Sequence, residues 1–145
     1  MPMLSDEGKT VRLLMGSAYG LTAPVRSDWD TLYADIMLEP GARLPIDSDA
    51  EERAIYVVSG EIDLAGDRFT VGSLLILRPG DKLMVTAVTT ARFSLLGGAT
   101  MDGPRHIWWN FVSSSLERIE QAKADWAQGR FDSVPGEHEF IPLPE

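Results

Sequence analysis

Residues Ala54–Leu77, AIYVVSGEIDLAGDRFTVGSLLIL, form a series of short apolar runs separated by glycine, serine and aspartate. Runs rich in valine, isoleucine and aromatic residues, bounded by turn-forming residues, predict β-strands. The triplet Ala65-Gly66-Asp67 has the composition of a hairpin turn. The strands expected in this stretch are Ala54–Ser59, Glu61–Leu64, Arg68–Thr70 and Ser73–Leu77. Strands this short and this closely spaced indicate an all-β fold, either a sandwich or a barrel.

The same pattern continues on both sides of this stretch. Pro79-Gly80-Asp81 predicts a further tight turn. The additional strands expected are Val11–Met15, Thr31–Leu38, Lys82–Val88, Ala91–Leu96 and Arg105–Val112. Residues 1–10 are polar, and we expect them to be a flexible N-terminal arm. Residues 11–145 then form a single domain, because a chain of 145 residues suits one hydrophobic core.

One helix is expected near the C-terminus. Ser114 and Glu117 have the S-x-x-E spacing of a capping box, in which each side chain satisfies a backbone donor of the other residue. Gly129 ends the helix, since glycine readily adopts the left-handed conformation. The residues that form an apolar stripe at helical spacing are Leu116, Ile119, Ala122, Lys123 and Trp126.

Composition excludes several classes of function. The chain has 13 basic and 22 acidic residues, a net charge of −9, and its basic residues are scattered singly. We therefore expect no binding to nucleic acids or to anionic membranes. The absence of cysteine excludes disulfides, thiolate nucleophiles and cysteine metal sites. Apolar runs such as Leu74–Leu77 are far shorter than the roughly 20 residues that span a bilayer, so we expect a cytoplasmic protein.

The segment Gly41–Gly60, GARLPIDSDAEERAIYVVSG, resembles the first cupin motif. In that motif a glycine is followed by two histidines spaced one residue apart, then by a glutamate and a hairpin glycine. Alternate residues of a strand face the same side, so the two imidazoles point at one metal. Residues Gly72–Gly80, GSLLILRPG, resemble the second motif with its Pro-Gly turn. The resemblance implies a cupin, a jelly roll of the RmlC-like type.

The metal ligands of a cupin are replaced in this chain. Asp47, Asp49 and Arg53 stand at the ligand positions of the first motif, and the histidine expected after the Pro-Gly turn falls near Leu83. An arginine brings a permanent positive charge to the place of the metal. We therefore expect no metal and no cofactor, with Arg53 paired to Asp47 or Asp49. The alternative is a carboxylate-only metal site. The degenerate site is completed by Tyr56 and Met84, expected to line the interior.

The two histidines, His106 and His138, form no metal-binding pair in the sequence. His138 lies in a tail rich in proline and glutamate. On the strand expected at 105–112, His106, Trp108 and Asn110 share one face. One interpretation makes this face a partly covered surface. The other places the three residues at a pocket mouth or at a partner interface.

The segment from Gly103 to Trp126, GPRHIWWNFVSSSLERIEQAKADW, resembles the end of the C-terminal domain of bacterial pirins. Val11–Val25 resembles the pirin segment that leads into that domain, so the resemblance covers the chain from about residue 9 to residue 145. It implies a pirin C-terminal cupin domain standing alone. In pirins, the metal-binding histidines and glutamate lie in the N-terminal domain. The activities described for the family include metal-dependent quercetin dioxygenation and transcriptional coregulation. We transfer neither to this chain, because no residue of its sequence matches the metal ligands of the family.

Three hypotheses follow. The first is a non-catalytic binding or assembly module that forms a homodimer. The second is a sensor of a small organic ligand, which Arg53 would bind with Tyr56 and Met84 lining the pocket. The third is a metal-dependent enzyme, an oxygenase similar to a quercetinase or an isomerase, with its metal held by Asp47 and Asp49 and assisted by His106. The missing imidazoles place the enzyme last.

Overall fold

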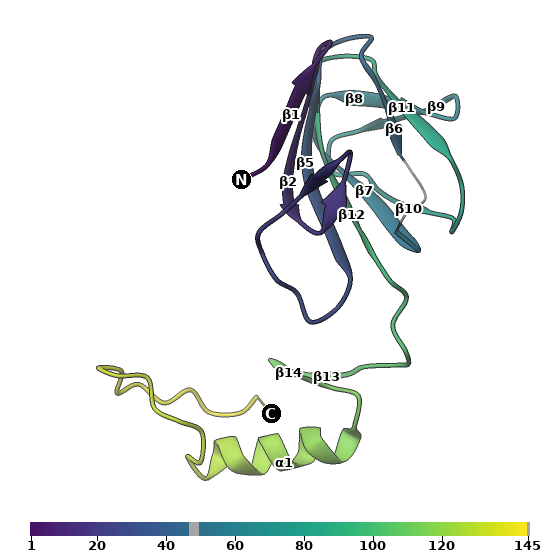
Figure 1. Cartoon of the computed structure of the whole chain (residues 1–145). Coiled ribbons are helices and arrows are strands. Elements are labelled where there is room, and N and C mark those ends of the chain that lie inside the picture. The colour runs from purple at the N-terminus through teal and green to yellow at the C-terminus, as the bar shows by residue number, and fades with distance from the viewer. Residues whose placement is uncertain (47–49, 145) are drawn as a thin grey trace. The chain divides into compact units, whose positions relative to one another are not determined.

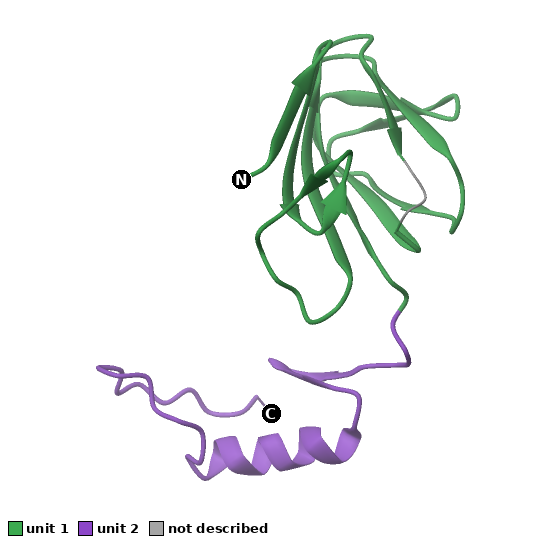
Figure 2. Ribbon diagram, in the orientation of Figure 1, with its two compact units in different colours: residues 1–100 green, residues 101–145 purple. Residues whose placement is uncertain are grey.

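The computed structural model describes residues 1–46 and 50–144, shown in Figure 1. The chain divides into two compact units, Met1–Thr100 and Met101–Glu145, which Figure 2 distinguishes by colour. Each unit has its own hydrophobic contacts and is described separately below.

The first unit is a sandwich of antiparallel strands. A six-stranded sheet has the order β1-β2-β5-β12-β7-β10, and a four-stranded sheet has the order β6-β11-β8-β9. The strands of the larger sheet are β1 (Met3–Asp6), β2 (Lys9–Met15), β5 (Thr31–Leu38), β7 (Glu52–Ser59), β10 (Leu74–Leu77) and β12 (Ala91–Gly98). The smaller sheet contains β6 (Arg43–Ile46), β8 (Glu61–Leu64), β9 (Asp67–Thr70) and β11 (Leu83–Ala87). The pair β3 (Ser17–Ala18) and β4 (Leu21–Thr22) forms a separate ribbon.

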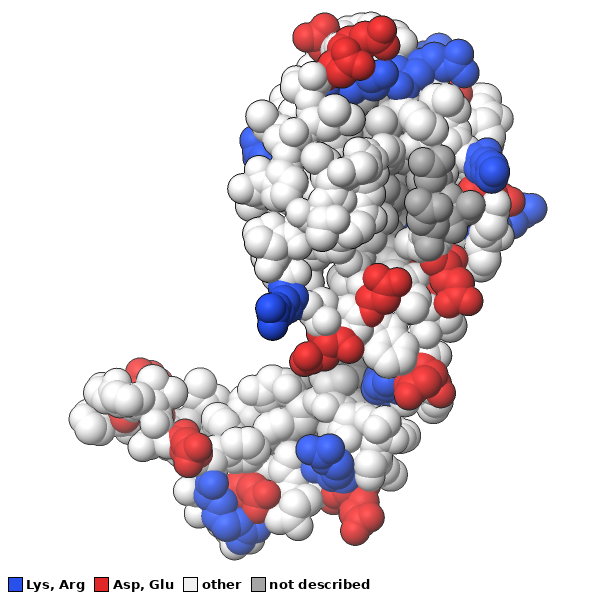
Figure 3. Space-filling view, viewed as in Figure 1, with Lys and Arg blue, Asp and Glu red and all other residues white. Residues whose placement is uncertain are grey.

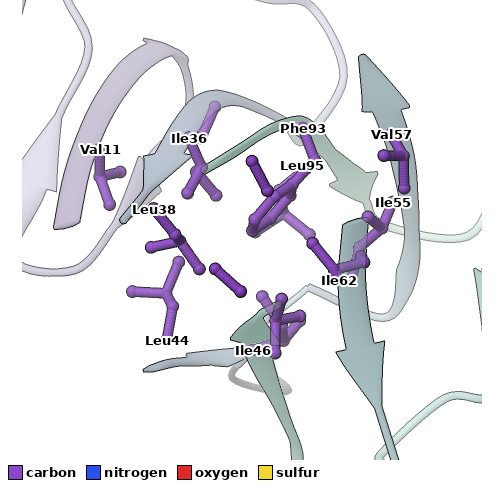
Figure 4. Close-up of a cluster of buried hydrophobic side chains, with 14 of the residues drawn as sticks. Val11, Ile36, Leu38, Leu44, Ile46, Ile55, Val57, Ile62, Phe93 and Leu95 are labelled. Carbon is purple, nitrogen blue, oxygen red and sulfur yellow. The ribbon is translucent and has the colours of Figure 1, made fainter. Parts of the chain in front are cut away.

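The core lies between these two sheets. Alternate residues of each strand face inward, as the burial of Ile55 and Val57 on β7 shows. Figure 4 shows the buried side chains that the two sheets direct toward one another, with Phe93 of β12 among them. Removing this apolar surface from water is the main stabilising contribution to the unit.

The predicted strands and turns of the first unit are largely confirmed. Thr31–Leu38 and Glu61–Leu64 match their expected bounds, and the other strands differ by one to two residues at their ends. Ala65 and Gly66 connect β8 to β9 with φ of 57° and 91°, the left-handed values of a two-residue hairpin turn. The Asp63 carboxylate accepts a hydrogen bond from the Gly66 N–H at 3.2 Å, which holds this turn.

Two edge strands differ from the sequence-based expectation. Residues 3–6, expected to lie in a loose arm, form β1 and pair with β2 in antiparallel register. Strand β6 was not predicted, because it is short and contains Pro45. This strand lies at the edge of its sheet, where a residue without an N–H group is tolerated.

The second unit contains a hairpin and the expected helix. The strand predicted at 105–112 is instead two strands, β13 (His106–Trp108) and β14 (Phe111–Ser113). Trp109, with φ of 52°, begins the turn between them. Because the chain reverses there, Phe111 lies opposite Trp108 rather than on the other face, and their rings stack with centroids 6.2 Å apart.

Aromatic rings form the small core of this unit. Phe111 of β14 meets Trp126 of helix α1 (Leu116–Ala127) at a centroid distance of 6.3 Å, and Trp126 also contacts Phe131 at 5.7 Å. The Trp126 indole N–H donates to the carbonyl of Ile141 at 2.7 Å. The tail after the helix is therefore attached to it by both apolar and polar contacts.

The start of α1 lies one residue later than its capping signal predicted. Ser115, rather than Ser114, is the N-cap, and its hydroxyl accepts from the Arg118 N–H at 3.4 Å. The residue at the third helical position is thus Arg118, so the capping box with Glu117 does not form. Gly129 follows the helix with φ of 64°, as expected for a terminating glycine.

Replacing Ser115 with alanine should destabilise α1 by about 1 kcal/mol, since the Arg118 N–H loses its acceptor. Ser114→Ala serves as the matched control and should have almost no effect. Hydrogen exchange of the Arg118 and Ile119 amides measures the difference. Equal exchange in the two variants would contradict the assignment of Ser115 as the cap.

Candidate functional site

Arg53, which the sequence resemblance predicts to stand at a ligand position of the first cupin motif, lies inside the sandwich. It precedes Ile55 and Val57 on the inward face of β7, and only 3% of it is exposed. One guanidinium nitrogen, Nη1, donates to the carbonyls of Ile46 at 3.3 Å and Asp81 at 2.9 Å. The other, Nη2, donates to the carbonyl of Arg78 at 2.9 Å.

These acceptors come from both cupin motifs. Ile46 ends β6 in the first motif. Arg78 and Asp81 flank the Pro-Gly turn of the second, where the Asp81 N–H donates to the Arg78 carbonyl at 3.3 Å and Gly80 has φ of 79°. The predicted turn is thereby confirmed. The guanidinium therefore joins β7, β6 and the turn after β10 through one buried group.

The charge of this group decides the chemistry of the interior. A guanidinium remains protonated and presents only donors, so it cannot act as a metal ligand. In an interior of low dielectric constant it also repels a divalent cation more strongly than it would in water. Three carbonyl oxygens offset the cost of removing it from water.

The other residues of the predicted pocket separate into two groups. Leu83 is half-buried against the core, opposite Ile46 on the neighbouring strand, and lies inside with Arg53. Tyr56 is 42% exposed on the opposite face of β7, and Met84 is 39% exposed on the outer face of β11. Neither lines the interior with Arg53, because side chains alternate between faces along a strand. Asp47 and Asp49 lie outside the described residues.

His106, Trp108 and Asn110 belong to the second unit, where His106 and Trp108 share one face of β13 and Asn110 lies in the turn that follows. His106 is exposed at the start of β13. Trp108 is half-buried, with the Lys123 ammonium 4.7 Å from the centre of its ring. Asn110 lies in the turn and lines a groove of about 670 Å³ together with Arg105 and other residues of this unit. The hairpin turn separates Asn110 from the strand position that the sequence predicted.

Three carboxyl groups of the second unit are held in the charged form by local hydrogen bonds. The Arg105 side chain lowers the pKa of Asp102, and the Arg130 side chain lowers the pKa of Asp125. The backbone N–H groups of Glu139 and His138 lower the pKa of Glu137. Each contributes to stability above its ordinary pKa and loses that contribution as the pH falls through the lowered value.

Two features of residues 1–46 and 50–144 bear on function. This part of the chain contains no group of three or more histidine, aspartate or glutamate side chains placed to hold a metal ion. It also contains no helix with the length and apolar content needed to cross a membrane.

The family is decided by comparison with known proteins. The model of the pirin C-terminal cupin domain matches residues 33–132. The chain belongs to the pirin family. A pirin-like protein of Caulobacter vibrioides is 38% identical over 146 residues, which is 100% of this chain and 50% of that protein. Pirin of Homo sapiens is 30% identical, over 90% of this chain and 47% of that protein. The chain thus spans about half the length of these pirin relatives.

A solved structure shares the cupin fold. The crystal structure of quercetin 2,3-dioxygenase from Acinetobacter baumannii superposes with a TM-score of 0.86, over 99% of this chain and 50% of that one, at 21% identity. The fold expected from the two degenerate motifs is therefore confirmed, and this pirin-family chain corresponds to about half of that enzyme.

Proposed function

We propose that this pirin-family domain is a non-catalytic binding and assembly module whose interior is closed by Arg53 in place of a metal. The buried guanidinium carries the proposal, because the motif resemblance predicts a metal ligand at this residue and the guanidinium donates to three backbone carbonyls instead. A metal would need both the removal of this charge and new ligands. Imidazoles, on which iron and nickel sites of this kind depend, are absent from both motifs.

A metal-dependent oxygenase is the second candidate. It is favoured by the superposition on a quercetin 2,3-dioxygenase. In this chain it would rely on Asp47 and Asp49, and two carboxylates hold a transition metal poorly. The fold supports many functions, so the likeness by itself does not transfer the activity.

A sensor of small ligands is less well supported by the contacts of Arg53. To bind an anion, the guanidinium would have to exchange carbonyl acceptors that it already holds at 2.9 Å. Tyr56 and Met84, which were expected to complete such a pocket, lie on outer faces. The proposal also includes no nucleic-acid partner, because the net charge is −9 and, on the face that Figure 3 shows, basic side chains lie close to acidic ones.

Metal content tests the proposal. The purified chain is incubated separately with iron, nickel, manganese and zinc, desalted, and measured by elemental mass spectrometry. We expect well under one metal ion per chain in every case. The same measurement on Asp47→Asn/Asp49→Asn, with Asp63→Asn as the control, identifies the ligands of any metal that is retained.

Stoichiometric retention that is lost in the double variant and kept in Asp63→Asn would overturn the proposal and support the oxygenase. Quercetin-dependent oxygen consumption that follows the added metal would do the same. Equal, substoichiometric metal in all three proteins supports the metal-free module.

A further inference from the structure

On the outer face of the six-stranded sheet, exposed apolar side chains lie on four neighbouring strands, β5, β12, β7 and β10. Ile55 and Val57 of β7 face the core, so Tyr56 and Val58 face outward. The strand register places other exposed side chains beside them. We call this surface the outer patch, and its members, between 37% and 75% exposed, are Met37, Tyr56, Val58, Leu74, Ile76 and Leu96.

Such a face is unusual for a sheet in contact with water. An antiparallel sheet packed on one side normally alternates apolar residues inside with polar residues outside. Here one row across the outer face reads Tyr33, Leu96, Ala54 and Ile76, with no polar side chain apart from the tyrosine hydroxyl. The next row reads Asp35, Ser94, Tyr56 and Leu74, so the polar residues of this face lie toward β5 and the apolar ones toward β10.

The charged side chains that lie between Met37 and the other members of the outer patch are paired with one another. The Asp35 carboxylate accepts from Arg92 Nε at 2.7 Å and Nη2 at 3.2 Å, and Arg12 Nη1 lies 3.6 Å from it. The hydrogen bonding of the Arg92 guanidinium to the Asp35 carboxylate raises the pKa of Arg92. The cluster has a formal charge of +1 in a chain whose net charge is −9. Two acidic chains therefore meet less repulsion on this face than the net charge would suggest.

The exposed area is sufficient for a stable interface. At about 200 Å² for a fully exposed large side chain, the six residues of the outer patch expose about 600 Å². A standard interface buries about 800 Å² per partner, and little more than half of that area is apolar. The patch thus supplies the apolar part of one such interface without help from the rest of the surface.

We propose that two copies of this chain associate face to face through the outer patch, related by a two-fold axis. Flat antiparallel sheets pack in this way at about 10 Å, and a two-fold axis lets one apolar face cover an identical one. The inference deepens the proposed assembly role, since it names the surface and the partner. It does not depend on whether the interior holds a metal.

The experiment compares two isoleucines of equal exposure on different surfaces of the full chain. Ile76 in the outer patch is 75% exposed, and Ile107 on β13 is 72% exposed. Sedimentation velocity at micromolar concentration should show a dimer for the wild type and for Ile107→Lys. Ile76→Lys should raise the dissociation constant at least about tenfold, because a charged lysine would be buried in the interface in place of the most exposed apolar side chain of the outer patch.

A second measurement uses the absence of cysteine from the chain. Ile76→Cys should be joined into covalent dimers by a short bismaleimide, whereas Ile107→Cys should remain monomeric on denaturing gels. A monomeric wild type would overturn the inference. A dimer weakened by Ile107→Lys and not by Ile76→Lys would show that the outer patch is not the interface, while the proposed assembly role would stand. The metal-content measurement is unaffected by either result.

Discussion

Replacing Arg53 with methionine is expected to lower the free energy of unfolding of the first unit by about 3 kcal/mol. Methionine fills much of the same volume but donates no hydrogen bond. The carbonyls of Ile46, Arg78 and Asp81 would then lose the donors they have in the native structure. Urea titration followed by the indole N–H resonance of Trp29 measures this, since that group donates to the Ala99 carbonyl within the same unit.

Two further arginine variants make the result specific. Arg43 lies on the neighbouring β6 and is exposed, so Arg43→Met should change stability by less than about 0.5 kcal/mol. Arg53→Lys keeps the charge but loses the planar fork of donors, and should fall between the wild type and Arg53→Met. Wild-type stability in Arg53→Met would show that the guanidinium does not hold the two motifs together.

Replacing Gly60 with alanine should cost about 4 kcal/mol, which combines a left-handed backbone with a steric overlap. Gly60 has φ of 77°, and a Cβ placed on it would lie 2.2 Å from the carbonyl oxygen of Thr90 and 2.8 Å from Cα of Ala91. Both atoms belong to the backbone at the start of β12, so relieving the overlap requires the turn after β7 to move.

Gly41, the first glycine of the same motif, is the matched control. Its φ of 81° is nearly identical, but a Cβ there would meet no heavy atom within 4 Å. Gly41→Ala should therefore cost only about 1 to 2 kcal/mol, the backbone contribution alone. Urea unfolding followed by circular dichroism provides the comparison. Similar losses of unfolding free energy in the two variants would contradict this prediction. They would indicate that the left-handed backbone conformation alone, and not the close approach of β12, sets the cost of Gly60→Ala.

The sequence predicted the sandwich well because its strands have local signals. Glu61–Leu64 and the Ala65-Gly66 turn combine alternation with turn chemistry, and both were located correctly. Strand β6 has no such signal, since Pro45 argues against a strand unless its place at an edge is known. The turn at Trp109 was also missed, because tryptophan is not a typical residue for positive φ.

The candidate site was predicted less completely. The position of Arg53 followed from the motif, and its burial is consistent with that position. Its acceptors did not follow, because the carbonyls of Ile46, Arg78 and Asp81 belong to the backbone and have no signature in the side chains. The prediction that Tyr56 lines the interior of the sandwich is at odds with its position three residues after Arg53 on the same strand. An odd separation along one strand puts the two side chains on opposite faces.

The order of strands in the larger sheet also bears on how the chain folds during synthesis. Strand β12 lies between β5 and β7 and pairs with both along its whole length. The centre of this sheet cannot close until Gly98 has left the ribosome, and the partners of β12 begin about 40 and 60 residues earlier. Contacts so distant in sequence form slowly. The hairpin of β13 and β14 and the helix α1 are formed by residues close together in the sequence, so these elements can form without waiting for the larger sheet.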